Sequence, residues 1–164
     1  MLFLVPSTYC VSQSDSTEFA DFKKFALSIK SQTVDEEDTL AVPRVPQPNR
    51  KINNYLKECA LDSNSIEKVK DLCFYVILKT FKSQILKTGR DYSLQYGIDN
   101  GIVIVGVKVL GLENFGEENF PYPSVTSYSF FKYISENRDQ FKLKELNTLY
   151  SEIKNLLIDN YGEY

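Results

Sequence analysis

Five stretches of the chain carry apolar residues at three- and four-residue steps, the spacing that places side chains on one face of a helix. These stretches are residues 15–32, 52–62, 64–89, 124–134 and 143–160. Asp15, Asn64 and Ser124 stand where N-caps are expected, each ahead of an apolar run. Residues 72–78, LCFYVIL, are apolar all round, which a helix tolerates only when neighbours cover it. We therefore predict five helices, with the one over residues 64–89 at the centre of the fold.

Residues 91–110 show a different pattern, in which two β-rich runs flank an Asn100-Gly101 pair. An Asn-Gly pair in this setting is typical of a type I′ turn, whose two central residues have φ > 0. Such a turn would make four pairs of apolar residues face one another, with all eight side chains on one face. The pairs are Tyr92 with Val109, Leu94 with Val107, Tyr96 with Val105 and Ile98 with Val103. The pattern predicts a β-hairpin over residues 91–110.

The predicted fold class is α+β. A small antiparallel sheet, built on the 91–110 hairpin plus a short N-terminal strand over residues 2–5, is packed by about five helices. The 164-residue chain is long enough for one filled core, so we expect a single domain over residues 1–164. Residues 33–49 hold four acids followed by three prolines, which predicts a mobile loop or linker.

Charge and cysteine content narrow the class of protein. The net charge of −3 lacks the basic excess that proteins use to bind nucleic-acid backbones. Three irregularly spaced cysteines form neither a disulfide framework nor a zinc pattern, which favours a reducing compartment. We find neither a signal peptide nor a membrane-spanning run. The expected location is cytoplasmic, in a host cytoplasm or inside a particle if the protein is viral or from a phage, an origin suggested by the many Lys, Asn, Ile, Tyr and Phe residues.

The chain contains no histidine. Histidine is the commonest metal ligand and the usual general base near neutral pH. Its absence excludes Ser-His-Asp and Cys-His catalysis and most zinc sites. We predict no catalytic residue, no bound metal and no cofactor, and we expect Cys59 and Cys73, on apolar helix faces, to be small core residues.

The predicted hairpin is similar to that of the PD-(D/E)xK nucleases, in which two carboxylates hold a divalent metal and a lysine lies beside the attacked phosphate. Asp91 or Asp99 matches the aspartate of that motif, and Lys108 matches its lysine. Gly106 stands at the glutamate position, so the pattern is degenerate. The resemblance covers about twenty residues and implies a nuclease-like or other phosphate-processing enzyme as an alternative function.

Basic residues gather near the end of the central helix and the start of the last one: Lys79, Lys82, Lys87, Arg90, Lys142 and Lys144. They could form a patch for an acidic partner or for RNA. Cations at a helix C-terminus more often complement the helix dipole on a solvated face, and we favour that interpretation.

The aromatic residues between 115 and 131 are the best candidates for a functional surface. Aromatic side chains with one exposed edge serve as anchors in protein interfaces. Phe130 and Phe131 are adjacent, so we expect them not to reach the same core. The leading prediction is a non-enzymatic protein–protein interaction, accessory, inhibitor or assembly protein, and a self-associating virion or complex subunit is a further alternative. The predicted partner-binding residues are Phe115, Phe120, Tyr122, Tyr128 and Phe130.

Overall fold

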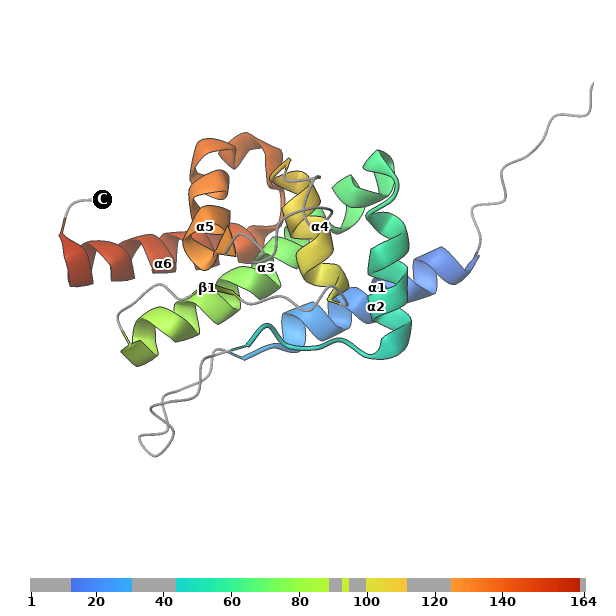
Figure 1. The fold of residues 1–164 in the computed structure, drawn as a ribbon, viewed down its shortest axis with the longest axis horizontal. Helices are drawn as coiled ribbons and strands as arrows, with labels where there is room; N and C mark the ends of the chain where they lie inside the picture. The colour runs from blue at the N-terminus through green and yellow to red at the C-terminus, as the bar shows by residue number, and fades with distance from the viewer. Residues whose placement is uncertain (1–12, 31–43, 89–92, 95–99, 112–124, 163–164) are drawn as a thin grey trace, which may run out of the picture.

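A computed structural model describes residues 13–30, 44–88, 93–94, 100–111 and 125–162. Within them the α-helices are α1 (Gln13–Ser28), α2 (Arg50–Cys59), α3 (Ser63–Thr88), α4 (Gly101–Val109), α5 (Ser127–Glu136) and α6 (Lys144–Tyr161), with a 3-10 turn at Arg138–Gln140 (Figure 1). The extended residues there are two short antiparallel segments, β1 (Ser93–Leu94) and β2 (Val125–Thr126). The fold is therefore all-helical, and the α+β prediction is wrong.

Helix α3 lies at the centre of the fold, as predicted. Each of the other five α-helices described contacts it. All seven residues of its apolar run 72–78 are buried. The ring of Phe74 lies 5.5 Å from that of Phe130, 5.8 Å from that of Tyr133 and 5.1 Å from that of Phe141, measured between centroids. A helix that is apolar on all sides is stable here because neighbours cover every side of this run.

Two contacts between distant parts of the sequence align α6 with α3. The Asp71 carboxylate accepts the backbone N–H groups of Lys142 at 2.6 Å and Leu143 at 2.7 Å, at the start of α6. Eleven residues further along α3, Lys82 forms an ion pair of 2.8 Å with Glu152. The two helices therefore run in the same direction. Asp71 satisfies N–H groups at a helix start that has no side-chain cap of its own.

The remaining predicted helices form, with corrections at their caps. Ile52, Tyr55, Leu56 and Cys59 on α2 are buried, and so are Phe22 and Ala26 on α1. Three caps differ from the prediction. Helix α1 begins two residues before Asp15, Thr126 caps α5 in place of Ser124, and Asp62 in place of Asn64 accepts the backbone N–H of Ser65 at the start of α3.

The predicted hairpin is the main error, because its second strand is helix α4. Asn100 has φ −89° and its side chain accepts the Ile102 N–H, so it is an N-cap and not a turn residue. Gly101 does not have the positive φ that a type I′ turn requires. A short apolar run can form either a buried strand or a buried helix, and periodicity alone does not separate them. Asn is as favourable at an N-cap as in a turn.

Both glycines of α4 have a packing role that the sequence pattern did not reveal. A Cβ on Gly101 would lie 2.7 Å from the Leu56 Cβ, and one on Gly106 would lie 2.6 Å from the Phe130 Cε1. These glycines let α4 approach α2 and α5 more closely than any larger residue allows. The close approach compensates for the poor helix propensity of glycine and of the β-branched residues around it.

Part of the predicted linker is packed against the helices. Val45 is buried in the core, and the Asn49 side chain caps α2 by accepting the Ile52 N–H at 2.9 Å. Residues 31–43, with the four acids, lie outside the described part of the chain, as does the strand predicted over residues 2–5.

Candidate binding surfaces

Three of the five predicted partner-binding residues, Phe115, Phe120 and Tyr122, lie outside the described residues. Tyr128 is half-buried near the start of α5, and its ring lies 6.5 Å from that of Phe131. Phe130 is fully buried, with its ring edge-on to Phe74. Its ring is therefore part of the core and is not exposed as an anchor.

Phe131 is also fully buried, which corrects the expectation that the two adjacent phenylalanines could not share one core. Its ring stacks on Tyr150 of α6 at 4.8 Å and lies 6.0 Å from Phe81 of α3. Because α5 packs against both α3 and α6, a wide arc of its surface is covered. Residues about 100° apart on the helix then both face inward.

The described part of the nuclease pattern lies on a helix and not on a strand. Asp91 and Asp99 lie outside the described residues, and Lys108 is half-buried in the last turn of α4. Gly106 lies in the middle of the same helix against the Phe130 ring. The resemblance depended on a β-hairpin, and the second strand of that hairpin is helix α4 in the structure. Among the described residues, no group of three or more Cys, Asp or Glu side chains is arranged to hold a metal ion.

The described cysteines and two lysines of the basic cluster have structural roles. Cys59 and Cys73 are buried, as predicted, and burial raises the pKa of the Cys73 thiol, with the neighbouring Cys59 adding to the effect. Lys82 is paired with Glu152, and the Lys142 ammonium donates to the Asp139 carbonyl. Lys79 differs from these, because its ammonium lies over the Tyr75 ring at 5.4 Å and it lines a cleft.

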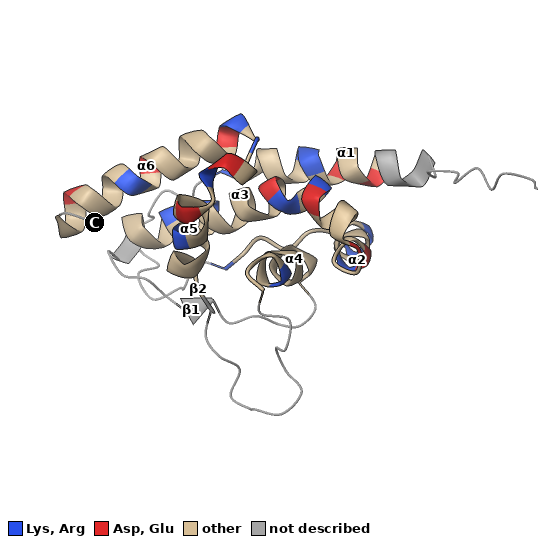
Figure 2. Ribbon diagram, turned by 90° about the horizontal axis from the view of Figure 1, so that it is seen from above, with Lys and Arg blue, Asp and Glu red and all other residues tan. Residues whose placement is uncertain are grey.

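Helix α4 presents an apolar face away from the core. Its buried residues are Gly101, Ile102, Val103, Val105 and Gly106. The opposite face carries Ile104, Val107 and Lys108, all half-buried, followed one turn later by the exposed Gly111. Lys108 is the one charged residue of α4, whereas α1, α2 and α6 each carry several (Figure 2). We call Ile104, Val107 and Lys108 the outer face of α4.

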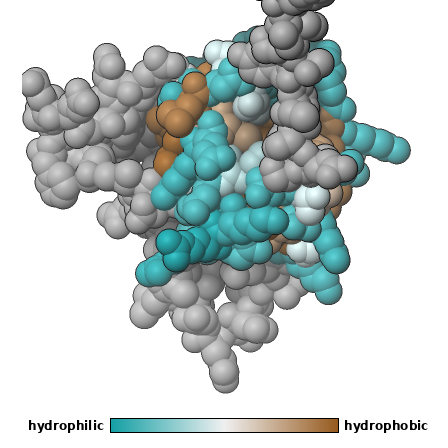
Figure 3. All heavy atoms as spheres, turned by 90° about the vertical axis from the view of Figure 1, so that its right-hand side faces the viewer, coloured by the Kyte–Doolittle hydropathy of each residue, from teal (hydrophilic) through white to brown (hydrophobic). Residues whose placement is uncertain are grey.

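Other exposed apolar residues are scattered. Among the described large apolar side chains, the most exposed are Leu61 between α2 and α3, Leu86 on α3, and Ile158 and Tyr161 on α6. On the side of the molecule shown in Figure 3, hydrophilic residues lie between two apolar areas. Single exposed apolar residues are normal on soluble domains and do not mark a site.

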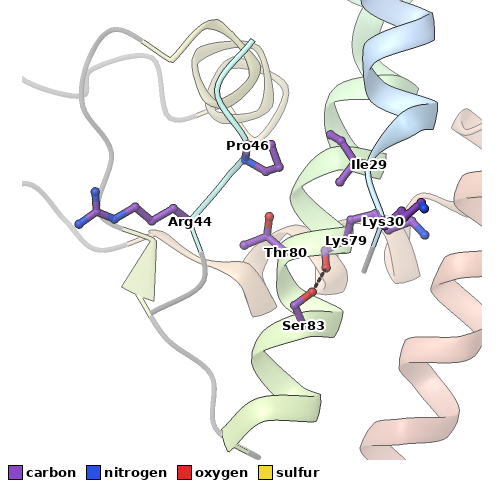
Figure 4. A pocket seen from close by; sticks show the side chains of 7 residues that line it. All are labelled: Ile29, Lys30, Arg44, Pro46, Lys79, Thr80 and Ser83. Atoms are coloured by element: carbon purple, nitrogen blue, oxygen red, sulfur yellow. Dashed lines mark hydrogen bonds between the residues drawn. The ribbon is translucent and has the colours of Figure 1, made fainter. Parts of the chain in front are cut away.

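A cleft opens between the end of α1, the segment before α2 and the middle of α3 (Figure 4). The cleft is wide open to solvent on one side. Thr80 and Ser83 form its floor, where their hydroxyl groups bond to the carbonyls of Val76 at 3.4 Å and Lys79 at 3.1 Å. Ile29 and Pro46 supply apolar walls, and the remaining lining residues are Lys30, Arg44 and Lys79.

The sequence patterns did not single out Lys30 or Arg44. They are fourteen positions apart, and only the packing of the segment before α2 against α3 brings both to the same cleft. The prediction assigned Lys79 to a solvated helix face and Arg44 to a linker, so neither suggested a shared site.

Within the described residues, no helix has the length and apolarity needed to cross a bilayer. In comparisons with family models, curated proteins and solved structures, no match to this chain was found.

Proposed function

We propose that this chain is a non-enzymatic interaction protein, acting as an accessory, inhibitor or assembly factor, and that it docks a protein partner on the outer face of α4. The observation that carries this proposal is the composition of that face. A surface helix normally turns charged or polar residues outward. The outer face of α4 instead has two β-branched apolar side chains and one lysine.

The energetics fit an interface. Fully burying a side chain such as Ile or Val contributes about 1.5 to 3 kcal/mol relative to leaving it exposed. Ile104 and Val107 are only half-buried, so a partner that covers them would gain part of that free energy. Lys108 borders the two apolar residues, in keeping with the polar rim that surrounds the apolar centre of protein interfaces.

The proposed surface is next to the predicted aromatic anchors in the sequence. Residues 112–124, which contain Phe115, Phe120 and Tyr122, directly follow α4 and its end at Gly111. These three aromatic residues remain in the proposal as anchors of the same partner. Phe130 is withdrawn from it, because its ring is in the core.

The test compares two substitutions of the same type on different helices. Ile104→Glu places a charge on the outer face of α4, and Ile158→Glu places one at a 40% exposed position on α6. Each variant is immobilised and exposed to extract of the cells that make the protein, and the retained proteins are identified by mass spectrometry. The strongest retained protein is then purified and its Kd for each variant is measured.

We expect one protein to be retained by the wild type and by Ile158→Glu and lost from Ile104→Glu, with a Kd at least about 30-fold weaker, which corresponds to a hot spot of 2 kcal/mol. The thermal midpoints of the two variants should be close. A midpoint for Ile104→Glu lower by ten degrees or more would mean that Ile104 is needed for internal packing, and the proposal would fail. If wild type sediments as an oligomer and Ile104→Glu as a monomer, the partner is a second copy of this chain.

A further inference from the structure

We infer that the cleft between α1, the segment before α2 and α3 is a binding site for a phosphate group. This inference is independent of the proposed docking surface, which lies on α4. Three cationic side chains line the cleft, Lys30, Arg44 and Lys79, on two sides of a floor formed by Thr80 and Ser83 (Figure 4). Cationic side chains that line one cleft are the chemistry that recognises phosphate oxygens, whereas the Thr80 and Ser83 hydroxyl groups already donate to helix carbonyls.

The charge balance of the cleft supports an external anion. None of the three cations forms an ion pair with a described residue, whereas Lys51, Lys70, Lys82 and Lys132 each have an acidic partner. The cleft residues include no acid. Lys30 stands two residues beyond the end of α1, where one cation complements the helix dipole. Arg44 and Lys79 exceed that requirement, since the dipole amounts to about half an elementary charge.

The three cations come from three separate segments of the chain and lie on two sides of the cleft. In Figure 4, Arg44 extends on one side of the cleft, and Lys30 and Lys79 lie on the other, with Thr80 and Ser83 between them. The Arg44 guanidinium points away from the floor, and its side chain is exposed, so rotation about its side-chain bonds is unobstructed by the core. Binding therefore consists of the rim cations folding over a phosphate seated near the floor. A dianion suits three cations better than the single charge of a carboxylate.

The walls of the cleft restrict the ligand further. Ile29 and Pro46 give the organic group of a phosphate ester an apolar contact, so a phosphate ester should bind more tightly than free phosphate.

The experiment titrates the full chain with inorganic phosphate, phenyl phosphate and phenol, and follows the backbone amide signals by NMR. Phosphate and phenyl phosphate should shift the amides of Thr80, Ser83 and the residues beside Arg44, with the same signals moving in both titrations. Phenyl phosphate should bind at least about threefold more tightly, since its ring buries apolar surface against Ile29 and Pro46. Phenol, which lacks the anion, should cause no shift at these amides.

Three substitutions each remove one of the cleft cations: Lys30→Gln, Arg44→Gln and Lys79→Gln. The matched control is Lys154→Gln on α6, which changes the net charge equally at an exposed position away from the cleft. Each cleft variant should weaken phosphate binding by about threefold, the size expected for one partly screened charge contact. The triple variant should lose the binding. In addition, phosphate should raise the thermal midpoint of the wild type and of Lys154→Gln but not that of the triple variant.

Three results would overturn the inference. The first is a wild type that shows no shift at the cleft amides at phosphate concentrations of several millimolar. The second is an equal loss of affinity in Lys154→Gln and in the cleft variants, which would reduce the effect to net charge. The third concerns the four acids at 35–38, which lie in sequence between Lys30 and Arg44. If phosphate binds only after these acids are changed to amides, the cleft cations pair with the chain's own carboxylates, and the cleft is not a phosphate site in the natural protein.

Discussion

Helices α3 and α4 are alike in sequence and different in surroundings. Each contains a continuous apolar run with no clear polar face. The run 72–78 of α3 is fully buried, and five other helices contact α3. Helix α4 packs against α2, α3 and the Phe130 ring, and its outer face is only half-buried. An apolar helix is stable wherever enough of its circumference is covered, and the part left uncovered is available to a partner.

The contacts that cover the two helices also differ in kind. Large aromatic rings fill the space around α3, where Phe74 meets three other rings. Helix α4 is held by close approach, because Gly101 and Gly106 carry no side chain at the contact points. Removing atoms should therefore damage the surroundings of α3 most, and adding atoms should damage those of α4. The predictions below test this contrast in order of decreasing effect.

The largest effect is expected for Phe74→Ala on α3. This side chain is fully buried, and its removal leaves a cavity between α3, α5 and the segment around Phe141. We expect the free energy of unfolding to fall by about 3 to 5 kcal/mol. Urea denaturation measures the change, and Leu86→Ala on the exposed side of α3 is the control, with an expected loss under about 1 kcal/mol. Equal losses in the two variants would contradict the central position of α3.

Gly106→Ala on α4 should destabilise the protein although it adds only one methyl group. The new Cβ would lie 2.6 Å from the Phe130 Cε1 and 3.1 Å from the Ile77 Cδ1. Overpacking of this kind costs about 1 to 3 kcal/mol, and the better helix propensity of alanine returns up to about 1 kcal/mol. We expect a net loss of about 1 to 2 kcal/mol in urea denaturation. The loss should be smaller in a Phe130→Leu background, and a stabilised Gly106→Ala protein would show that the contact is not tight.

Asn100 distinguishes a helix cap from a hairpin turn. In the structure it is buried and accepts the Ile102 N–H at 3.1 Å. Asn100→Ala should therefore cost about 1 kcal/mol, the usual loss for a missing N-cap, while Asn100→Ser should keep most of the stability. A type I′ turn would tolerate serine poorly, because both central residues need φ > 0. Thermal unfolding of the two variants distinguishes the cap from the turn. An equal loss of stability in Asn100→Ala and Asn100→Ser would favour the turn.

The smallest effect concerns the cap of α3. Asp62 accepts both the hydroxyl and the backbone N–H of Ser65, at 2.8 and 2.9 Å, and these bonds lower its pKa in the folded state from the ordinary value of an aspartate. The unfolded chain therefore binds the proton at higher pH than the folded one. The stability from this carboxylate is fully present above the unfolded pKa and is lost as the pH falls through the folded pKa.

The measurement for Asp62 is the difference in stability between the wild type and Asp62→Asn as a function of pH. Asparagine caps a helix as well as aspartate does but carries no charge. The wild type should be the more stable protein at neutral pH, and the two should converge below about pH 4. A difference that stays constant down to pH 2 would show that the charge of Asp62 has no part in the cap.

The candidate sites were harder to foresee than the helices. Ile104 and Val107 were visible as apolar residues, but the prediction placed Val107 on a buried strand face, so the outer face of α4 was missed. Phe130 was predicted as an anchor because two adjacent phenylalanines were not expected to be buried in the same core. The sequence did not show that both α3 and α6 cover α5, which buries the two rings. Lys30 and Arg44 had no common pattern before the fold brought their segments together.

What the amino-acid sequence determined by itself is the set of long helices and their buried faces. Apolar spacing in α1, α2, α3, α5 and α6 extends over enough turns to exclude a strand, and the apolar run 72–78 already required a central position. The tertiary structure alone decided the state of residues 101–109. Their β-branched residues favour a strand locally, yet the fit of Gly101 on Leu56 and of Gly106 on Phe130 exists only in the helix. Packing between distant segments outweighs a local preference of about 1 kcal/mol or less per residue, which no short window of sequence can report.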